Sequence, residues 1–152
     1  IGNFNSENKY YDLATKSEKS LLSTTGRGFY ILGLINPTHE PSNHALHDIE
    51  QYAADFEKWG QKIMLLFADE ETAGRYKDAE FKKLPNTVVY GTDINGVIAG
   101  EVKQALNLQS NERPIFIIAD TFNRIVFVSQ GYTIGLGEQM INVLHKLEEQ
   151  GK

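Results

Sequence analysis

The side chains best suited to chemistry lie together in one short turn, His39-Glu40-Pro41-Ser42. The turn separates an apolar run from an amphipathic stretch, so it lies where a strand is followed by a helix. In α/β proteins this place often holds ligands or reactive groups. Histidine can act as a general base near neutral pH, and a serine hydroxyl can act as a nucleophile when such a base is close. The turn is therefore the first candidate for a functional site.

Several kinds of site fit the turn, and they remain open at this stage. A helix that starts near Ser42 would present unpaired N–H groups and the positive end of its dipole, which favours a phosphate or carboxylate. His39, His44 and His47 match no common zinc spacing, so no metal site is predicted. No Gly-x-Ser-x-Gly elbow surrounds Ser42, which disfavours a serine nucleophile. The structural alternative is that Ser42 caps the helix and His39 is a solvated loop residue.

The composition is that of one globular domain. The chain has 152 residues, of which 41% are hydrophobic, and a net charge of −5. This acidic balance argues against a nucleic-acid partner, and no apolar run approaches the roughly 20 residues of a membrane span. The sequence contains no cysteine, which excludes disulfides, thiolate metal sites and cysteine nucleophiles. No cofactor is expected.

Hydrophobic periodicity predicts the elements that must position the turn. A mixed central sheet with helices on both faces follows, because alternating strands and helices form parallel pairs and a late hairpin adds an antiparallel edge. We expect residues 1–9 to be a polar lead-in and residues 10–152 to be a single domain, the C-terminal domain of a longer protein, since the chain starts at Ile1. The expected elements are a weak hairpin at 10–13 and 19–22, strands at 29–35, 63–68, 87–90, 114–119 and 125–129, and helices at 43–59, 69–84, 95–106 and 135–149.

This order resembles the thioredoxin-like fold, in the branch that holds peroxiredoxins and envelope thiol-disulfide reductases. The resemblance implies a three-layer α/β/α sandwich that ends in a β-hairpin and a helix. Four local features carry it: strand 29–35 leading into residues 36–42, Ala68-Asp69 after the next strand, Arg113-Pro114 before strand 115–120, and the hairpin at 123–128 followed by Gly131.

The resemblance assigns roles to individual residues of the turn. His39 stands in the place of the nucleophilic cysteine, Ser42 in that of the resolving cysteine, and Pro41 keeps its role. Pro114 would be the cis-proline of the family, with Arg113 beside the turn. A ligand site at the turn would therefore comprise His39, Glu40, Pro41, Ser42, Arg113 and Pro114.

The sequence also departs from the family pattern. Both sulfurs are missing, Thr38 replaces the usual tryptophan, and the helix-kinking proline is absent near His47. A second alignment sets Asn36-Pro37-Thr38 against the Cys-Pro-Thr of peroxiredoxins, and it also lacks the thiol.

The missing thiols decide the expected function. Disulfide exchange needs a thiolate, and peroxide reduction passes through a sulfenic acid. We therefore expect a non-catalytic interaction or structural domain of a larger bacterial protein, with other domains or a protein as partner and a periplasmic or other extracytoplasmic location implied by the resemblance. The alternatives are an anion or small-ligand domain, or an enzyme with non-thiol chemistry, at the His39–Ser42 turn.

Overall fold

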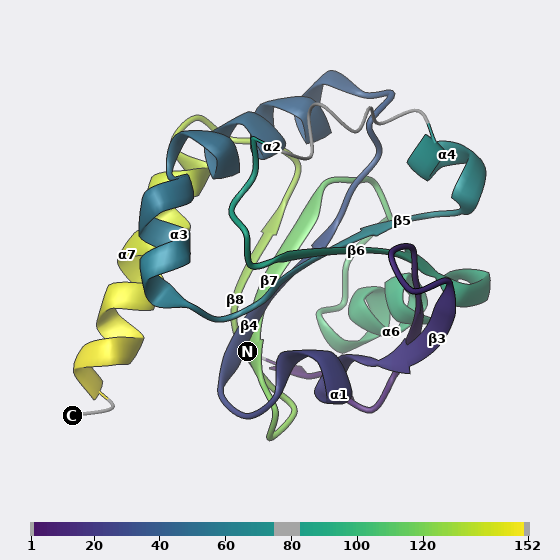
Figure 1. Cartoon of the computed structure of the whole chain (residues 1–152), viewed down its shortest axis with the longest axis horizontal. Helices are drawn as coiled ribbons and strands as arrows, with labels where there is room; N and C mark the ends of the chain where they lie inside the picture. Colours follow the sequence, from purple (N-terminus) through teal and green to yellow (C-terminus); the bar gives the residue numbers. More distant parts are fainter. Residues whose placement is uncertain (1, 75–82, 151–152) are drawn as a thin grey trace.

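The computed structural model describes residues 2–74 and 83–150, and one eight-stranded sheet forms its centre (Figure 1). The order across the sheet is β1-β8-β7-β4-β5-β6-β2-β3. The pairs β4–β5 and β5–β6 are parallel and all the others are antiparallel, so the predicted mixed sheet is confirmed. The strands are β1 (Gly2–Asn3), β2 (Lys9–Asp12), β3 (Ser17–Ser20), β4 (Phe29–Leu34), β5 (Ile63–Phe67), β6 (Val88–Asp93), β7 (Ile115–Asp120) and β8 (Arg124–Gln130).

Helices cover both faces of this sheet, which confirms the three-layer arrangement (Figure 1). One apolar cluster joins α2, α3 and α7 to the sheet, and a second cluster joins α6 to the opposite face. None of the helices in residues 2–74 and 83–150 has the length and apolar character needed to cross a membrane. The helices are α1 (Leu21–Thr25), α2 (Glu40–Gln51), α3 (Ala53–Trp59), α4 (Glu70–Gly74), α6 (Val97–Ala105) and α7 (Leu136–Gln150), with a 3-10 turn, η1 (Ile94–Gly96), before α6.

The ends of these helices follow from particular residues. Gly60 ends α3 with a left-handed φ of 80°, as its place in the sequence predicts, because glycine adopts this conformation without strain. Asp69 caps α4 by accepting the N–H of Thr72 at 2.7 Å, which confirms the predicted cap. The later part of that helix, expected up to residue 84, lies largely outside the described residues. Asp93 caps α6 with both carboxylate oxygens, although the sequence analysis missed it.

The first residues of the chain differ from the prediction. Residues 1–9 are expected as a polar lead-in, but β1 pairs with β8 and the side chain of Phe4 is completely buried. Ser6 is also buried, and its hydroxyl bonds to Tyr30 Oη at 3.0 Å. The second half of the expected hairpin is also different, since Leu21 begins α1 after Ser20 caps that helix. Residues 2–8 are therefore part of the folded domain.

Candidate functional site

The turn at the end of β4 leads into a helix that starts earlier than predicted. α2 begins at Glu40, and His39 is its N-cap residue, with extended backbone angles and no capping hydrogen bond from its side chain. Pro41 lies in the first helical turn, where its missing N–H would have no helical partner in any case. The expectation that Ser42 caps the helix is therefore wrong, because Ser42 is the third helical residue.

The Ser42 hydroxyl closes the turn from inside. Its side chain is fully buried, and Oγ accepts the backbone N–H of Asn36 at 2.9 Å. The Asn36 amide oxygen in turn accepts the N–H of Thr38 at 3.1 Å and the Thr38 hydroxyl at 2.7 Å. Asn43 donates from Nδ2 to the Pro37 carbonyl at 3.1 Å. The turn is thus a closed hydrogen-bonded unit, and the buried serine oxygen is not available to a substrate.

Arg113 joins the end of β5 to the residue that follows β4 through hydrogen bonds to their backbone carbonyls. Its Nη1 donates to the carbonyl of Leu66 at 2.9 Å and to that of Ile35 at 3.3 Å. Burial lowers the pKa of Arg113, while the carboxylates of Asp93 and Asp69 act in the opposite direction. A guanidinium remains protonated under ordinary conditions. Arg113 therefore places a partly buried positive charge at the carboxyl ends of the parallel strands.

The remaining candidates divide between the surface and the interior. Pro114 is buried, and the peptide bond between Arg113 and Pro114 is cis. His39, Glu40 and Pro41 are exposed. Glu40 is the acidic residue in the first turn of α2, where a negative charge interacts favourably with the helix dipole. An anion bound at the start of α2 would be repelled by the Glu40 carboxylate, which already interacts with the positive end of the helix dipole.

A further polar cluster joins α2 to the last helix. The buried carboxylate of Asp48 accepts the Tyr132 hydroxyl and the Gly137 N–H, each at 3.0 Å. The His44 ring stacks on that of Tyr132, with 5.3 Å between their centroids. Asp48 therefore caps α7 from a neighbouring helix. Sequence reasoning missed this role because its partners lie 84 and 89 residues away.

Among residues 2–74 and 83–150, no group of three or more His, Cys, Asp or Glu side chains is arranged to hold a metal ion. His47 lies near Glu50 instead, with 3.8 Å between Nδ1 and Oε2.

The sheet order and the turn before α2 define a thioredoxin-like α/β fold, here in a chain without cysteine. Neither a protein-family model nor a curated protein sequence matches the chain. Solved structures do match it, at sequence identities so low that they show the fold alone.

Three of these structures illustrate the likeness. A protein from Chlorobium tepidum assigned as the thiol:disulfide interchange protein DsbE has a TM-score of 0.67 and 13% identity, with 95% of this chain and 97% of that chain covered. A peroxiredoxin 6 from Arenicola marina has a TM-score of 0.70 and 16% identity, with 100% and 74% covered. A thioredoxin-like protein from Bacteroides caccae has a TM-score of 0.66 and 15% identity, with 95% of this chain covered; the match spans only 49% of that protein.

Proposed function

We propose that this chain is a redox-inactive thioredoxin-like domain that acts by binding, either to another domain of a longer protein or to a separate protein partner. The observation that carries the proposal is the buried Ser42 hydroxyl. It accepts the Asn36 N–H in the place that the resemblance gives to a resolving sulfur. Without cysteine the chain has no thiolate for disulfide exchange and no sulfur for a sulfenic acid.

The contacts of the turn support binding over catalysis. A serine nucleophile must reach the substrate and be hydrogen-bonded to its base, but the Ser42 side chain is fully buried and accepts a backbone N–H. His39 is exposed and makes no capping hydrogen bond. The Arg113 Nη1 atom already serves two backbone carbonyls. These groups stabilise the turn, and a stable surface is what a binding domain needs.

The proposal also includes a setting. We place the domain at the C-terminal end of a longer, envelope-associated bacterial protein. The support for this setting is the resemblance of the element order to envelope thiol-disulfide reductases.

Cross-linking mass spectrometry on the full-length protein in its native host tests the proposal. We expect reproducible lysine cross-links from this domain to another domain or protein, and we expect them to persist in the variant His39→Ala. His145→Ala on the exposed side of α7 is the matched control. The proposal would be contradicted if no such cross-links form and the protein has a catalytic activity that is lost in His39→Ala and kept in His145→Ala. That result would show that the chain is an enzyme.

A second candidate function is the binding of a small anion at the turn, with His39, Glu40, Pro41, Ser42, Arg113 and Pro114 around it. The observation that favours it is the partly buried Arg113 guanidinium beside the residue that precedes the turn. Titration with phosphate, sulfate and acetate, followed through the NMR signals of His39, tests this function. We expect saturable shifts that become larger in Glu40→Gln, because the competing carboxylate is gone; unmoved signals in both proteins would rule the site out.

A further inference from the structure

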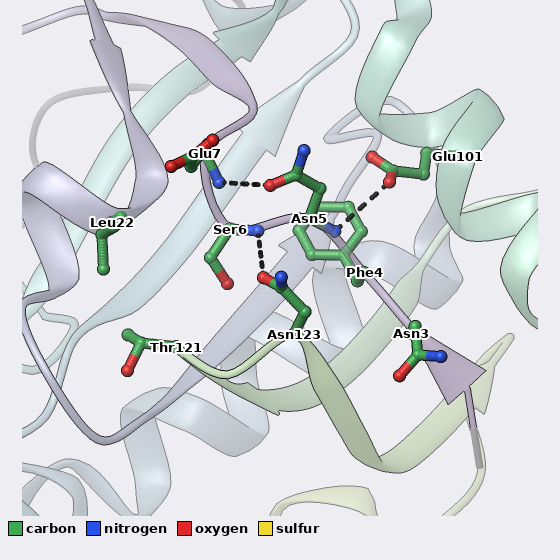
Figure 2. A pocket seen from close by; sticks show the side chains of 9 residues that line it. All are labelled: Asn3, Phe4, Asn5, Ser6, Glu7, Leu22, Glu101, Thr121 and Asn123. Atoms are coloured by element: carbon green, nitrogen blue, oxygen red, sulfur yellow. Dashed lines mark hydrogen bonds between the residues drawn. The ribbon is translucent and has the colours of Figure 1, made fainter.

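Figure 2 shows a polar hollow, which has a volume of about 450 Å³. It lies at the end of the sheet remote from the turn before α2. The residue pairing in the sheet establishes this position. Asp120, at the β7–β8 turn, pairs with Phe29 at the start of β4, whereas the candidate turn follows the other end of β4. The N-terminal segment, α6 and the β7–β8 turn all contribute to the lining. The hollow is thus separate from the site that the thioredoxin-like resemblance indicates.

Two exposed asparagine side chains line the hollow, and each is oriented by one hydrogen bond from its amide oxygen. Asn123 Oδ1 accepts the N–H of Ser6, and Asn5 Oδ1 accepts the N–H of Glu7, each at 2.9 Å. Figure 2 shows both contacts. The carboxamide atom that accepts a backbone N–H must be the oxygen, so the other terminal atom of each side chain is the nitrogen. Within the part of the chain that the structure describes, neither Nδ2 atom has a protein acceptor, so each has two N–H donors to offer a ligand.

The Glu101 carboxylate is held between α6 and the N-terminal segment. Its Oε1 accepts the N–H of Asn5 at 3.2 Å, and its Oε2 accepts the Asn8 side-chain amide. An ionised carboxylate oxygen has more than one lone pair, so each oxygen can accept a further hydrogen bond. The hollow therefore presents fixed acceptors beside the fixed amide donors, and little side-chain order has to be gained on binding.

We propose that this hollow binds a neutral polyhydroxylated small molecule, a saccharide. Glu7 and Glu101 both line the hollow, and their negative charge disfavours an anion. A metal cation is disfavoured because no group of three or more His, Cys, Asp or Glu side chains in the described residues is arranged to hold one. Hydroxyl groups can accept from the amides and donate to Glu101 at once. The volume lies within the range of small-molecule sites, about 300–1,000 Å³.

An NMR titration of the whole chain tests the proposal, with glucose, galactose and N-acetylglucosamine as probes. We expect saturable shifts of the Asn5 and Asn123 side-chain amide signals with at least one sugar, and no shift of His39. The double variant Asn5→Asp/Asn123→Asp keeps the oxygens that accept from Ser6 and Glu7 and replaces each amide nitrogen by a carboxylate oxygen. Its binding is followed through the backbone amide signals of residues 5–7 and 123, because the two side-chain amide signals are absent. It should bind about a hundredfold more weakly, since two hydrogen bonds of about tenfold each are lost.

Asn142→Asp is the matched control, because it makes the same chemical change at an exposed position of α7. It should bind like the wild type. Three results would overturn the proposal: no sugar moves the two amide signals, the double variant binds as tightly as Asn142→Asp, or phosphate or calcium moves these signals when no sugar does. The backbone amide spectrum of the double variant confirms that it is folded, so that a loss of binding is attributed to the missing donors.

Discussion

Replacing Ser42 by alanine tests whether the turn before α2 depends on the serine hydroxyl for its stability. In the native chain the buried Oγ accepts the Asn36 N–H at 2.9 Å and so closes the turn before α2. Alanine removes the acceptor but keeps a side chain that suits a helix. The Asn36 N–H would then have no partner in a half-buried position, where water replaces the lost contact only in part.

The expected loss follows from that single contact. A buried donor left unpaired costs about 1–3 kcal/mol, and the half-buried position of Asn36 favours the lower part of this range, about 1–2 kcal/mol. A domain of this size is typically stable by about 5–15 kcal/mol, so the variant should still fold. Since 1 kcal/mol shifts Tm by about 2–4 °C at this chain length, we expect Tm to fall by about 2–8 °C.

Urea unfolding followed by circular dichroism provides the measurement, with Thr133→Val as the control because it removes an exposed hydroxyl. The control should change the free energy of unfolding by no more than about 0.5 kcal/mol. Amide exchange should also become faster at Asn36 in Ser42→Ala. If Ser42→Ala is as stable as the control and its Asn36 exchange is unchanged, the hydroxyl does not hold the turn and the structural reasoning is refuted.

Three further predictions concern other parts of the fold. Phe4→Ala should cost about 3–5 kcal/mol in urea unfolding, because it empties a fully buried site; a loss below 1 kcal/mol would mean that the N-terminal segment does not contribute to the core. Asp48→Ala should cost about 2–4 kcal/mol and speed amide exchange at Gly137, since two donors lose a charged acceptor; unchanged exchange would contradict the cap. Burial acts to raise the pKa of Asp12, but backbone hydrogen bonds and the Lys19 ammonium outweigh it and lower that pKa below its ordinary value of 3.8. A carboxyl group with a lowered pKa stabilises the fold at pH values above its ordinary, unfolded-state pKa. This stabilisation is lost as the pH falls through the lower pKa of the folded state. The stability difference between wild type and Asp12→Asn should therefore shrink in acid, and a difference that is constant with pH would refute the assignment.

Much of the fold is predictable from the local sequence pattern, because each central strand or helix end is marked by a short run of residues. The apolar run that forms β4 and the run that forms β5 are of strand length and bounded by polar or turn residues, so their burial follows directly. Gly60 and Asp69 mark helix ends through their own backbone or side-chain chemistry. Apolar runs and helix-end residues depend only on residues nearby in the sequence, so they can be recognised without the structure.

The start of α2 shows where a local signal misleads. Serine is a favoured N-cap residue, so Ser42 indicates a start three residues too late. Pro41 carries the better signal, since proline prefers the first turn of a helix. The serine is buried for a different reason, because its hydroxyl reaches back to Asn36 in the turn. A serine hydroxyl can cap the helix that follows it or bond to the backbone of the turn that precedes it. The hydrophobic periodicity of the sequence does not distinguish these two roles.

Contacts between residues far apart in the chain could not be predicted from the sequence, for a different reason. Phe4 lies in a polar stretch, and its burial comes from long-range contacts: β1 pairs with β8, more than a hundred residues later, and Phe4 joins an apolar cluster with residues of α6. Asp48 looks like an ordinary charged residue on the polar side of a helix, and its partners lie far along the chain. The fixed carboxamide of Asn123 depends on the same N-terminal segment. Contacts of this kind come from the topology of the sheet and leave no spacing pattern.

The two ends of the sheet differ in how their polar groups are used. At the turn before α2, the Ser42 hydroxyl and the Arg113 Nη1 atom form hydrogen bonds with the backbone, so these two groups already have protein partners. At the opposite end, the amide nitrogens of Asn5 and Asn123 have no acceptor among the described residues, although their oxygens are held in place. A ligand gains most from donors that are both fixed and unpaired, because it then replaces only water and orders little protein. The hydrogen-bonded groups at the turn therefore favour the end with the polar hollow as the place where a ligand finds unpaired donors.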